Sequence, residues 1–281
     1  MSDLPAPTRR DKELGIATRR IGRPLWHYAS VPSTMPLAHD LARDGAPDGT
    51  TLWAEEQTAG RGRRGRSWVA PHGTALLCST ICRPPLRPDE LFLLVAAFGI
   101  GLCQGLEQAT GLRPQIKWPN DLLLAGRKLA GVLAESRLSG DGLAHTVVGF
   151  GLNVNLKAAD LPVPNAGALP PTSLTLALGA EVDRQAVLRA ILTGIDDAYD
   201  LLWHDRADIL RVAWAERLVG RGELVRIETD AGPRKGVFSG VDHDGALLLA
   251  VEGAIERIIV GDVVLGPRPT TIDEEAAKRR Q

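Results

Sequence analysis

The segment Gly60-Arg61-Gly62-Arg63-Arg64-Gly65-Arg66 places four arginines and three glycines in seven consecutive residues. It lacks the Lys-Ser/Thr ending of a P-loop, in which backbone N–H groups surround the phosphates. Glycines let a backbone bend and close, and arginine holds carboxylate or phosphate through a planar fork of donors at any working pH. The segment therefore predicts a loop that binds an anion through its side chains.

Strand patterns flank this loop at Thr50–Glu56 and Thr74–Cys82, whereas the residues between them carry neither a helix nor a strand pattern. A loop of that length inside a compact domain is usually functional. We therefore expect the loop to border a binding site.

The rest of the chain alternates helix and strand patterns. Helices are predicted at Ser33–Gly45, Pro88–Gly111, from Asp183 to Leu202 and at Ala207–Val219. Short strands are predicted at Gln115–Trp118, Leu122–Leu124, Lys128–Glu135 and Thr146–Asn155, with a hairpin turn at Ser139–Gly142, and four more follow Gly220 at Glu223–Glu228, Gly236–Val241, Leu247–Val251 and Ile255–Val260. This order predicts an α+β fold, with a mixed β-sheet flanked by helices and then a small C-terminal β-barrel. The expected divisions are a flexible tail over 1–24, a catalytic domain over 25–219, the barrel over 220–268 and a disordered tail over 269–281.

The composition limits the classes of protein to consider. Hydrophobic residues make up 44% of the chain and charged residues 24%, and the formal net charge is −1. These values are ordinary for a soluble globular protein, whereas a dedicated nucleic-acid binder would usually be basic overall. The apolar run Leu91–Leu102 is too short to span a bilayer and predicts a buried helix. Without a secretory pattern at the N-terminus, we expect a cytoplasmic protein with no membrane partner.

The three cysteines, Cys78, Cys82 and Cys103, form no Cys-x-x-Cys pair, and no His-Glu-x-x-His pattern is present. The sequence therefore predicts reduced core cysteines and no protein-held metal site.

Several polar clusters accompany the arginine loop. They are Ser33-Thr34 at a helix start, Gln57 before the loop, Lys117-Trp118-Pro119-Asn120-Asp121 between two strands, Lys128 at a strand start, and Gly149-Phe150-Gly151-Leu152-Asn153-Val154-Asn155 at a strand end. Each has an ordinary structural explanation, such as a helix cap, a turn or a glycine-bearing strand. Together they supply several cations, uncharged donors and a carboxylate to one site on a sheet. Such a site could bring a substrate carboxylate against the α-phosphate of a nucleotide, because fixed positive charge offsets the repulsion between the two anions.

These motifs, in this order over about residues 26–156, resemble those of biotin protein ligase, and the segment after Gly220 is similar to that family's small C-terminal domain. The resemblance implies that biotin and ATP, with Mg²⁺ on the phosphates, give biotinyl-5′-AMP and pyrophosphate. The biotinyl group then passes to one lysine of a biotin carboxyl carrier domain. A loop that orders over this reactive anhydride would exclude water.

The resemblance also implies residue roles. Biotin binding is expected at Ser33, Thr34, Gln57, Gly60, Arg61, Lys128 and Gly131; nucleotide binding at Arg63, Arg66, Trp68, Asn120 and Asn153; and catalysis at Lys128, Arg63 and Asp121. Asp121 is expected to accept or orient the incoming lysine, whose ammonium must lose a proton before it attacks. The family often forms dimers, so a homodimer is also expected.

Two departures from the family pattern stand out. Met35-Pro36 follow Ser33-Thr34 where the family commonly has Asn or Gln, which predicts a missing or replaced polar contact near biotin. The residues before Trp26 are too few for the winged-helix domain of bifunctional members, so no DNA binding is expected.

Three alternatives remain. A lipoate or octanoate ligase shares the fold and the adenylate chemistry. A nucleic-acid-binding protein could grip phosphates with the arginine loop and stack bases on Trp68. A non-catalytic biotin-binding module is the third, against which Lys128 and the arginines argue.

Overall fold

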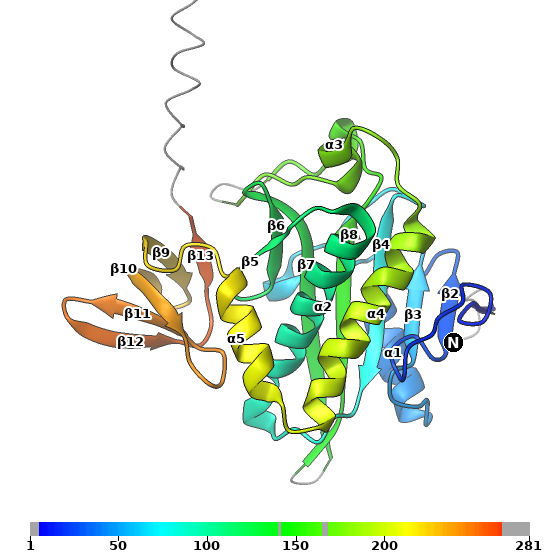
Figure 1. The fold of residues 1–281 in the computed structure, drawn as a ribbon, viewed down its shortest axis with the longest axis horizontal. Helices are drawn as coiled ribbons and strands as arrows, with labels where there is room; N and C mark the ends of the chain where they lie inside the picture. The colour runs from blue at the N-terminus through cyan, green and yellow to red at the C-terminus, as the bar shows by residue number, and fades with distance from the viewer. Residues whose placement is uncertain (1–5, 140–141, 165–167, 266–281) are drawn as a thin grey trace, which may run out of the picture.

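The computed structural model describes residues 6–139, 142–164 and 168–265, which form a large sheet flanked by helices and a smaller C-terminal sheet (Figure 1). Residues 140 and 141 of the predicted hairpin turn lie outside this description. So do residues 1–5 and the predicted tail over 269–281.

The large sheet has eight strands in the order β1-β2-β3-β4-β8-β7-β6-β5. Its strands are β1 (Thr8–Arg9), β2 (Leu25–Tyr28), β3 (Thr51–Ala54), β4 (Ala75–Cys82), β5 (Gln115–Lys117), β6 (Asp121–Leu124), β7 (Arg127–Ser139) and β8 (Gly142–Asn153). Strands β2 and β3 are parallel, and the other neighbours pair antiparallel, so the predicted mixed sheet is confirmed.

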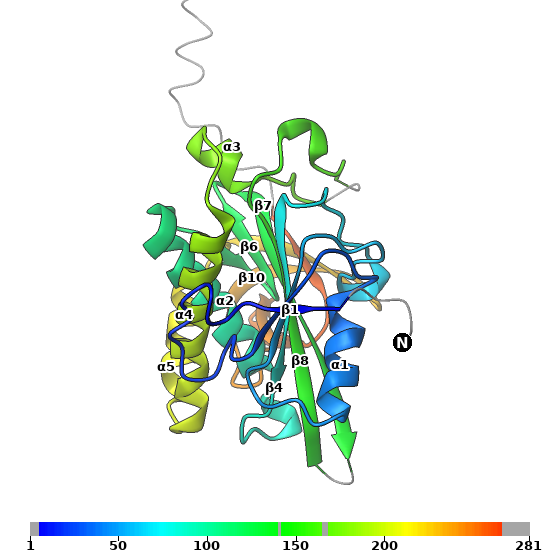
Figure 2. The ribbon, with the colours of Figure 1, turned by 90° about the vertical axis from the view of Figure 1, so that its right-hand side faces the viewer.

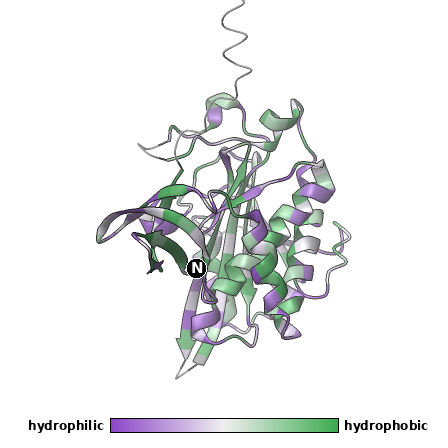
Figure 3. Cartoon of the chain, turned by 60° about the vertical axis from the view of Figure 1, so that its left-hand side comes forward, coloured by the Kyte–Doolittle hydropathy of each residue, from purple (hydrophilic) through white to green (hydrophobic). Residues whose placement is uncertain are grey.

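Helices cover both faces of this sheet, as Figure 2 shows. Helix α1 (Thr34–Arg43) lies on one face, and α2 (Phe92–Thr110), α4 (Arg184–Trp203) and α5 (Ala207–Arg217) lie on the other, with the short α3 (Leu174–Leu178) between β8 and α4 in the chain. Alternate residues of β3 pack into the cores on opposite faces of the sheet, because successive strand residues point to opposite faces. Leu52 packs with the core under α1, whereas Trp53 packs with the core under α2 and α4. Hydrophobic residues follow the central strands, and the helices carry both hydrophobic and hydrophilic residues (Figure 3).

Helix α2 confirms the predicted buried helix, although the apolar stretch is longer than the sequence analysis allowed. Residues Pro88–Thr110 are long and apolar enough to cross a membrane by length and composition, but 67% of their most apolar window is buried inside the protein. Two glycines explain the tight packing of α2 on α4. A methyl group at Gly101 would lie 2.4 Å from Ile195 Cα, and one at Gly105 would lie 2.5 Å from Ile191 Cα. Helix α2 is therefore a core helix of the fold.

The segment before β2 differs from the predicted mobile tail. Between Ala6 and Pro24 the chain packs on the domain, and Leu14 and Ile21 are buried in the core. The buried carboxylate of Asp196 on α4 accepts hydrogen bonds from the backbone N–H groups of Arg19, Arg20 and Ile21 at 2.7, 2.9 and 3.0 Å. The charged sequence of this segment did not predict the packing, because the residue that binds it, Asp196, lies on a helix far away in the sequence.

The C-terminal strands form a five-stranded antiparallel sheet in the order β12-β11-β10-β9-β13. Its strands are β9 (Leu224–Thr229), β10 (Gly232–Val241), β11 (Leu247–Val251), β12 (Ala254–Ile258) and β13 (Asp262–Val264). Within the described residues, the two edge strands β12 and β13 do not pair with each other, so the predicted barrel is observed as a sheet. Strand β13 was not predicted, because it is three residues long and its partner β9 lies far away in sequence.

Candidate active site

A cavity of about 100 Å³ lies above β7 and β8 and below the arginine loop. Its lining combines the helix start, the loop, the turn before β6 and the glycines of the two strands: Ser33, Thr34, Met35, Gln57, Arg61, Gly62, Arg63, Arg66, Ser67, Trp68, Cys78, Ser79, Asn120, Asp121, Lys128, Gly131, Val132, Leu133, Gly149, Phe150, Gly151 and Asp262. The motifs that the sequence analysis selected therefore meet at one place.

The end of the cavity next to α1 is polar but uncharged. The side-chain carbonyl Oε1 of Gln57 accepts hydrogen bonds from Thr34 N at 2.8 Å and Thr34 Oγ1 at 3.0 Å. Thr34 Oγ1 also lies 2.7 Å from Ser79 Oγ on β4. Ser33 stands at the N-cap of α1, yet its hydroxyl does not cap the helix and, among the described residues, finds no hydrogen-bond partner although it is buried. A buried hydroxyl without a partner is costly, so Ser33 Oγ is suited to bind a ligand.

Glycines make room for larger side chains on the floor of the cavity. A methyl group at Gly151 would lie 2.4 Å from Trp68 Cε2, and one at Gly149 would lie 2.6 Å from Met35 Sδ. The Trp68 indole and the Met35 thioether therefore rest directly on the sheet. The thioether of Met35 thus forms part of the lining at the position where the family commonly has an amide.

The arginine loop is closed by its own backbone. Trp68 N donates to Gly60 O at 3.0 Å, Gly62 N donates to Arg66 O at 2.7 Å, and Arg61 and Ser67 form an isolated antiparallel bridge. A methyl group at Gly60 would lie 2.3 Å from Trp68 O, so the close approach at the base of the loop requires glycine. The loop therefore presents its arginines from a compact, hairpin-like turn.

One carboxylate from the C-terminal sheet meets this loop. Asp262 on β13 pairs with Arg66, and it lies 3.5 Å from Arg63 and 4.0 Å from Arg64. Burial raises the pKa of Asp262, but Arg66, Lys117 and Arg63 outweigh burial and hold that pKa below its usual value. An anionic group thus already occupies part of the arginine cluster.

The turn between β5 and β6 and the start of β7 contribute the remaining charges. Lys128 Nζ lies 2.8 Å from Asp121 Oδ1 and 5.6 Å from the centre of the Trp68 ring. Arg63 Nη1 donates to Asn120 Oδ1 at 3.0 Å, and Asn120 Nδ2 donates to Val132 O at 2.6 Å. Burial lowers the pKa of Lys117, although Asp121 and Asp262 oppose that shift. The cations of Lys128, Arg63 and Arg66 and the carboxylates of Asp121 and Asp262 therefore line this end of the cavity.

Two predicted site residues lie outside the lining. Gly60 acts at the base of the loop, and Asn153 is buried with its amide donating to Thr172 O at 2.9 Å. The other predicted residues line the cavity, namely Ser33, Thr34, Gln57, Arg61, Arg63, Arg66, Trp68, Asn120, Asp121, Lys128 and Gly131.

The sequence analysis missed Asp262 and Ser79. Asp262 lies 196 positions from its partner Arg66, so no local pattern could reveal it. Ser79 had a weak signal, as one of two adjacent hydroxyl residues, Ser79 and Thr80, inside a mainly apolar strand. The three cysteines are buried and free, as predicted, and burial raises the pKa of Cys103 to about 12.

Comparison with known proteins agrees with this arrangement. Residues 28–153 match the Biotin/lipoate A/B protein ligase family, and residues 222–266 match the Biotin protein ligase C terminal domain. The bifunctional ligase/repressor BirA of Bacillus subtilis is 36% identical over 255 residues, which cover 90% of this chain and 77% of that protein. The biotin–[acetyl-CoA-carboxylase] ligase of Paracoccus denitrificans is 35% identical over 249 residues, covering 85% of this chain and 99% of that protein.

Solved structures agree as well. The biotin protein ligase from Aquifex aeolicus in complex with biotin and ATP is similar with a TM-score of 0.69 and 29% sequence identity. The match covers 85% of this chain and 97% of that one. The chain belongs to the biotin protein ligase family.

Proposed function

We propose that this protein activates biotin with ATP and transfers the biotinyl group to one lysine of a biotin carboxyl carrier domain. In the first step a biotin carboxylate oxygen attacks the α-phosphorus of ATP, and pyrophosphate leaves. In the second step the lysine amine attacks the acyl carbon, AMP leaves, and the amine loses a proton. The observation that carries this proposal is one cavity with an uncharged polar end and a cationic end beneath the same loop.

The uncharged end suits the ureido ring of biotin, which offers N–H donors and a carbonyl acceptor. Ser33 Oγ is free to bind it, and Thr34 and Gln57 are held in place by their mutual hydrogen bonds. The Trp68 indole lies close against Gly151 on the floor of the cavity. Arg61 from the loop and Gly131 from the floor also line the cavity, and we assign both to biotin.

The cationic end suits the reacting carboxylate and phosphates. Lys128 is the cation beside the floor, while Arg63 and Arg66 reach in from the loop. Fixed positive charge in a site closed to water stabilises charge in the transition state more strongly than it would in bulk solvent. We assign Lys128 to both reacting groups, and Arg63 and Arg66 to the phosphates. Trp68 and Asn120 are assigned to nucleotide binding. Asn153 is assigned to the same side of the site, although it lies outside the cavity lining.

Asp121 is the carboxylate assigned to the second step. Its Oδ1 lies 2.8 Å from Lys128 Nζ, so a positively charged lysine of the carrier could be drawn to the same place. A carboxylate there can accept or orient the proton that the amine must lose before it attacks.

We expect ATP to enter as its Mg²⁺ complex. The lining offers the carboxylates of Asp121 and Asp262, and each is already paired with a cation. The ion would therefore be held mainly by phosphate oxygens and water, as is common for Mg²⁺ on nucleotides.

Pyrophosphate exchange tests this proposal. With biotin present, the protein should exchange labelled pyrophosphate into ATP, and with lipoate or octanoate it should not. Exchange driven by lipoate would favour the alternative ligase, and the absence of exchange with either acid would contradict the proposed first step. Transfer of biotin to an isolated carrier domain, followed by mass spectrometry, tests the second step.

The nucleic-acid alternative is not favoured, because three of the four loop arginines line the cavity, and of these Arg63 pairs with Asn120 and Arg66 with Asp262. The expected homodimer and the expected lack of DNA binding stay predictions.

A further inference from the structure

The turn between β10 and β11, Asp242–Ala246, is seated on the catalytic domain. Gly245 O accepts a hydrogen bond from the indole Nε1 of Trp118 at 2.9 Å, and Trp118 is 1% exposed. Gly245 has φ +84°, and a methyl group there would lie 2.2 Å from Cγ of Phe92 on α2. Both its conformation and its close contact with Phe92 therefore require glycine at this position.

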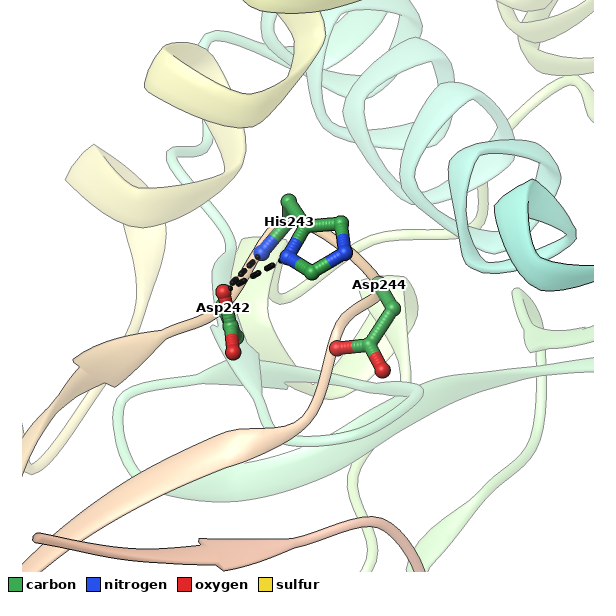
Figure 4. A group of neighbouring side chains, drawn as sticks. All are labelled: Asp242, His243 and Asp244. Atoms are coloured by element: carbon green, nitrogen blue, oxygen red, sulfur yellow. Dashed lines mark hydrogen bonds and ion pairs between the residues drawn. The ribbon is translucent and has the colours of Figure 1, made fainter.

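The turn is stiffened from within. Arg257 on β12 pairs with Asp242 and with Asp244, each at 2.7 Å. Asp242 Oδ1 accepts from His243 N at 2.7 Å and lies 2.8 Å from His243 Nδ1, as Figure 4 shows. The three side chains in Figure 4 are close enough to suggest a metal site, but Arg257 already forms an ion pair with each of the two carboxylates. We therefore interpret the cluster as a brace that holds the shape of the turn.

Trp118 lies in the middle of the Lys117–Asp121 turn, whose other side chains serve the site. Asn120 accepts from Arg63, and Asp121 pairs with Lys128. Lys117 is buried and borders a second cavity of about 530 Å³ that it shares with Arg66 and Asp262. One short turn thus contacts the C-terminal sheet through its tryptophan and the cationic end of the active site through its neighbours.

We infer that Gly245 and Trp118 are positioning residues, and that the seating of the C-terminal turn on Trp118 aligns the Lys117–Asp121 turn for the nucleotide half of the reaction. The inference rests on the proposed function, and neither residue is expected to touch a substrate. The uncharged end of the cavity is held by a separate set of bonds among Thr34, Gln57 and Ser79. Disturbing the turn should therefore weaken the use of ATP and leave the binding of biotin alone unchanged.

Two variants and a matched control test this inference. Gly245→Ala adds a methyl group against Phe92 at a positive φ, whereas Trp118→Phe removes the indole donor and keeps an aromatic ring. Gly253→Ala is the control, because Gly253 has φ +85° in the next turn of the same sheet and would bring its methyl group within 4 Å of nothing. This control carries the same backbone strain without the contact to the catalytic domain.

The measurements are the KM for ATP and kcat in biotin-dependent pyrophosphate exchange, and the Kd for biotin without ATP by calorimetry. Relative to Gly253→Ala, we expect Gly245→Ala to lower kcat/KM for ATP by about tenfold or more. Trp118→Phe should lower it by about two- to tenfold, as loss of one buried hydrogen bond implies. The Kd for biotin should stay within about twofold of wild type in all three variants.

The outcomes separate the two proposals. If the wild-type protein exchanges pyrophosphate but both variants match Gly253→Ala, the positioning role is overturned while the proposed function stands. A parallel loss of biotin affinity would also overturn it, because a general loss of structure affects both halves of the site. If Gly245→Ala does not fold, Trp118→Phe alone decides. A wild-type protein without exchange would overturn the proposed function and this inference with it.

Discussion

Lys128 and Asp121 form the ion pair to which the proposed function assigns the reacting groups. Their charges are 2.8 Å apart, and each partner neutralises the other in the free protein. Gly131 borders this pair, because a methyl group there would lie in ordinary contact with it, 3.4 Å from Asp121 Oδ1 and 3.6 Å from Lys128 Nζ. At the scale of single residues, the positive charge of Lys128 offsets the negative charge of Asp121, and an incoming anion would change this balance.

Replacing Lys128 should therefore affect the first step strongly. In Lys128→Ala, biotin-dependent pyrophosphate exchange should fall by about 100-fold or more, since one fixed charge aimed at developing negative charge is worth that much in other enzymes. Lys235→Ala is the control, because Lys235 is exposed on the C-terminal sheet. An exchange rate for Lys128→Ala within about tenfold of the control would contradict the assigned role.

Asp121→Ala examines the other partner of the pair. It should slow transfer of biotin to the carrier at least as much as it slows adenylate formation, measured by labelling a carrier domain with preformed biotinyl-5′-AMP. Carrier labelling at the wild-type rate would show that Asp121 plays no part in the second step.

How much of the site the sequence predicts depends on whether the residues are close together in the chain. Ser33, Thr34, Gln57 and Lys128 belong to short motifs, and they line the cavity as predicted. Asp262 was missed because its contacts with the loop exist only after the C-terminal sheet has docked. Asn153 sits in a matching motif, yet its amide bonds to the backbone of Thr172, which no local pattern specifies.

Among the elements, α1 is attached to the sheet by a buried pair of histidines. His39 Nδ1 lies 2.9 Å from His145 Nε2 on β8, and Glu135 on β7 lies 3.6 Å from His39 Nε2. Burial, with the charges of Arg137 and His145, lowers the pKa of His39 even though Glu135 and Asp40 oppose the shift. Burial, with Arg83 and Arg137, likewise lowers the pKa of His145.

This pair makes the stability of the protein depend on pH. The unfolded chain takes up protons at these histidines near pH 6.5, before the folded protein does, so acid favours unfolding. The stability that the neutral pair contributes is present above about pH 6.5 and is lost as the pH falls toward the lowered pKa values. We expect the melting temperature to drop between pH 7.5 and pH 5.5, and to drop less in His145→Gln.

The control for this prediction is His72→Gln, because His72 is exposed. This variant should keep the pH dependence of the wild-type protein. The same pH dependence in His145→Gln as in the wild-type protein would show that the pair does not carry the effect.

The long helices and central strands could be predicted because their own residues carry the pattern. Helix α4 shows hydrophobic residues at helical spacing and a capping Asp183, whose carboxylate accepts from Gln185 N and Ala186 N. A strand as short as β5 was predicted, whereas β1, β2 and β13, which are two to four residues long, were not. They form because a partner strand is already in place.

At the scale of the whole molecule, the arginine loop joins the two sheets. Arg64 pairs with Asp230 beyond β9, and Arg66 pairs with Asp262 on β13, so the C-terminal sheet holds the loop over the cavity. Asp262 is part of the lining, whereas the Asp230 side chain is 74% exposed. A buried or partly buried ion pair resists screening by salt better than an exposed one. Closure of the loop should therefore depend on Asp262 more than on Asp230.

Trypsin can measure this difference, because it cleaves after arginine and the loop offers Arg61, Arg63, Arg64 and Arg66. Asp262→Asn removes a carboxylate that lies near three of these arginines, so the loop should be cut severalfold faster than in the wild-type protein. Asp230→Asn is the matched control and should be cut at nearly the wild-type rate, since it loses one exposed pair. Biotin with ATP should protect the loop in the wild-type protein by occupying the arginines. Cleavage of both variants at the wild-type rate would mean that the loop closes without the C-terminal sheet. If biotin with ATP then protected the loop in both variants, the loop itself would be responsible for closure.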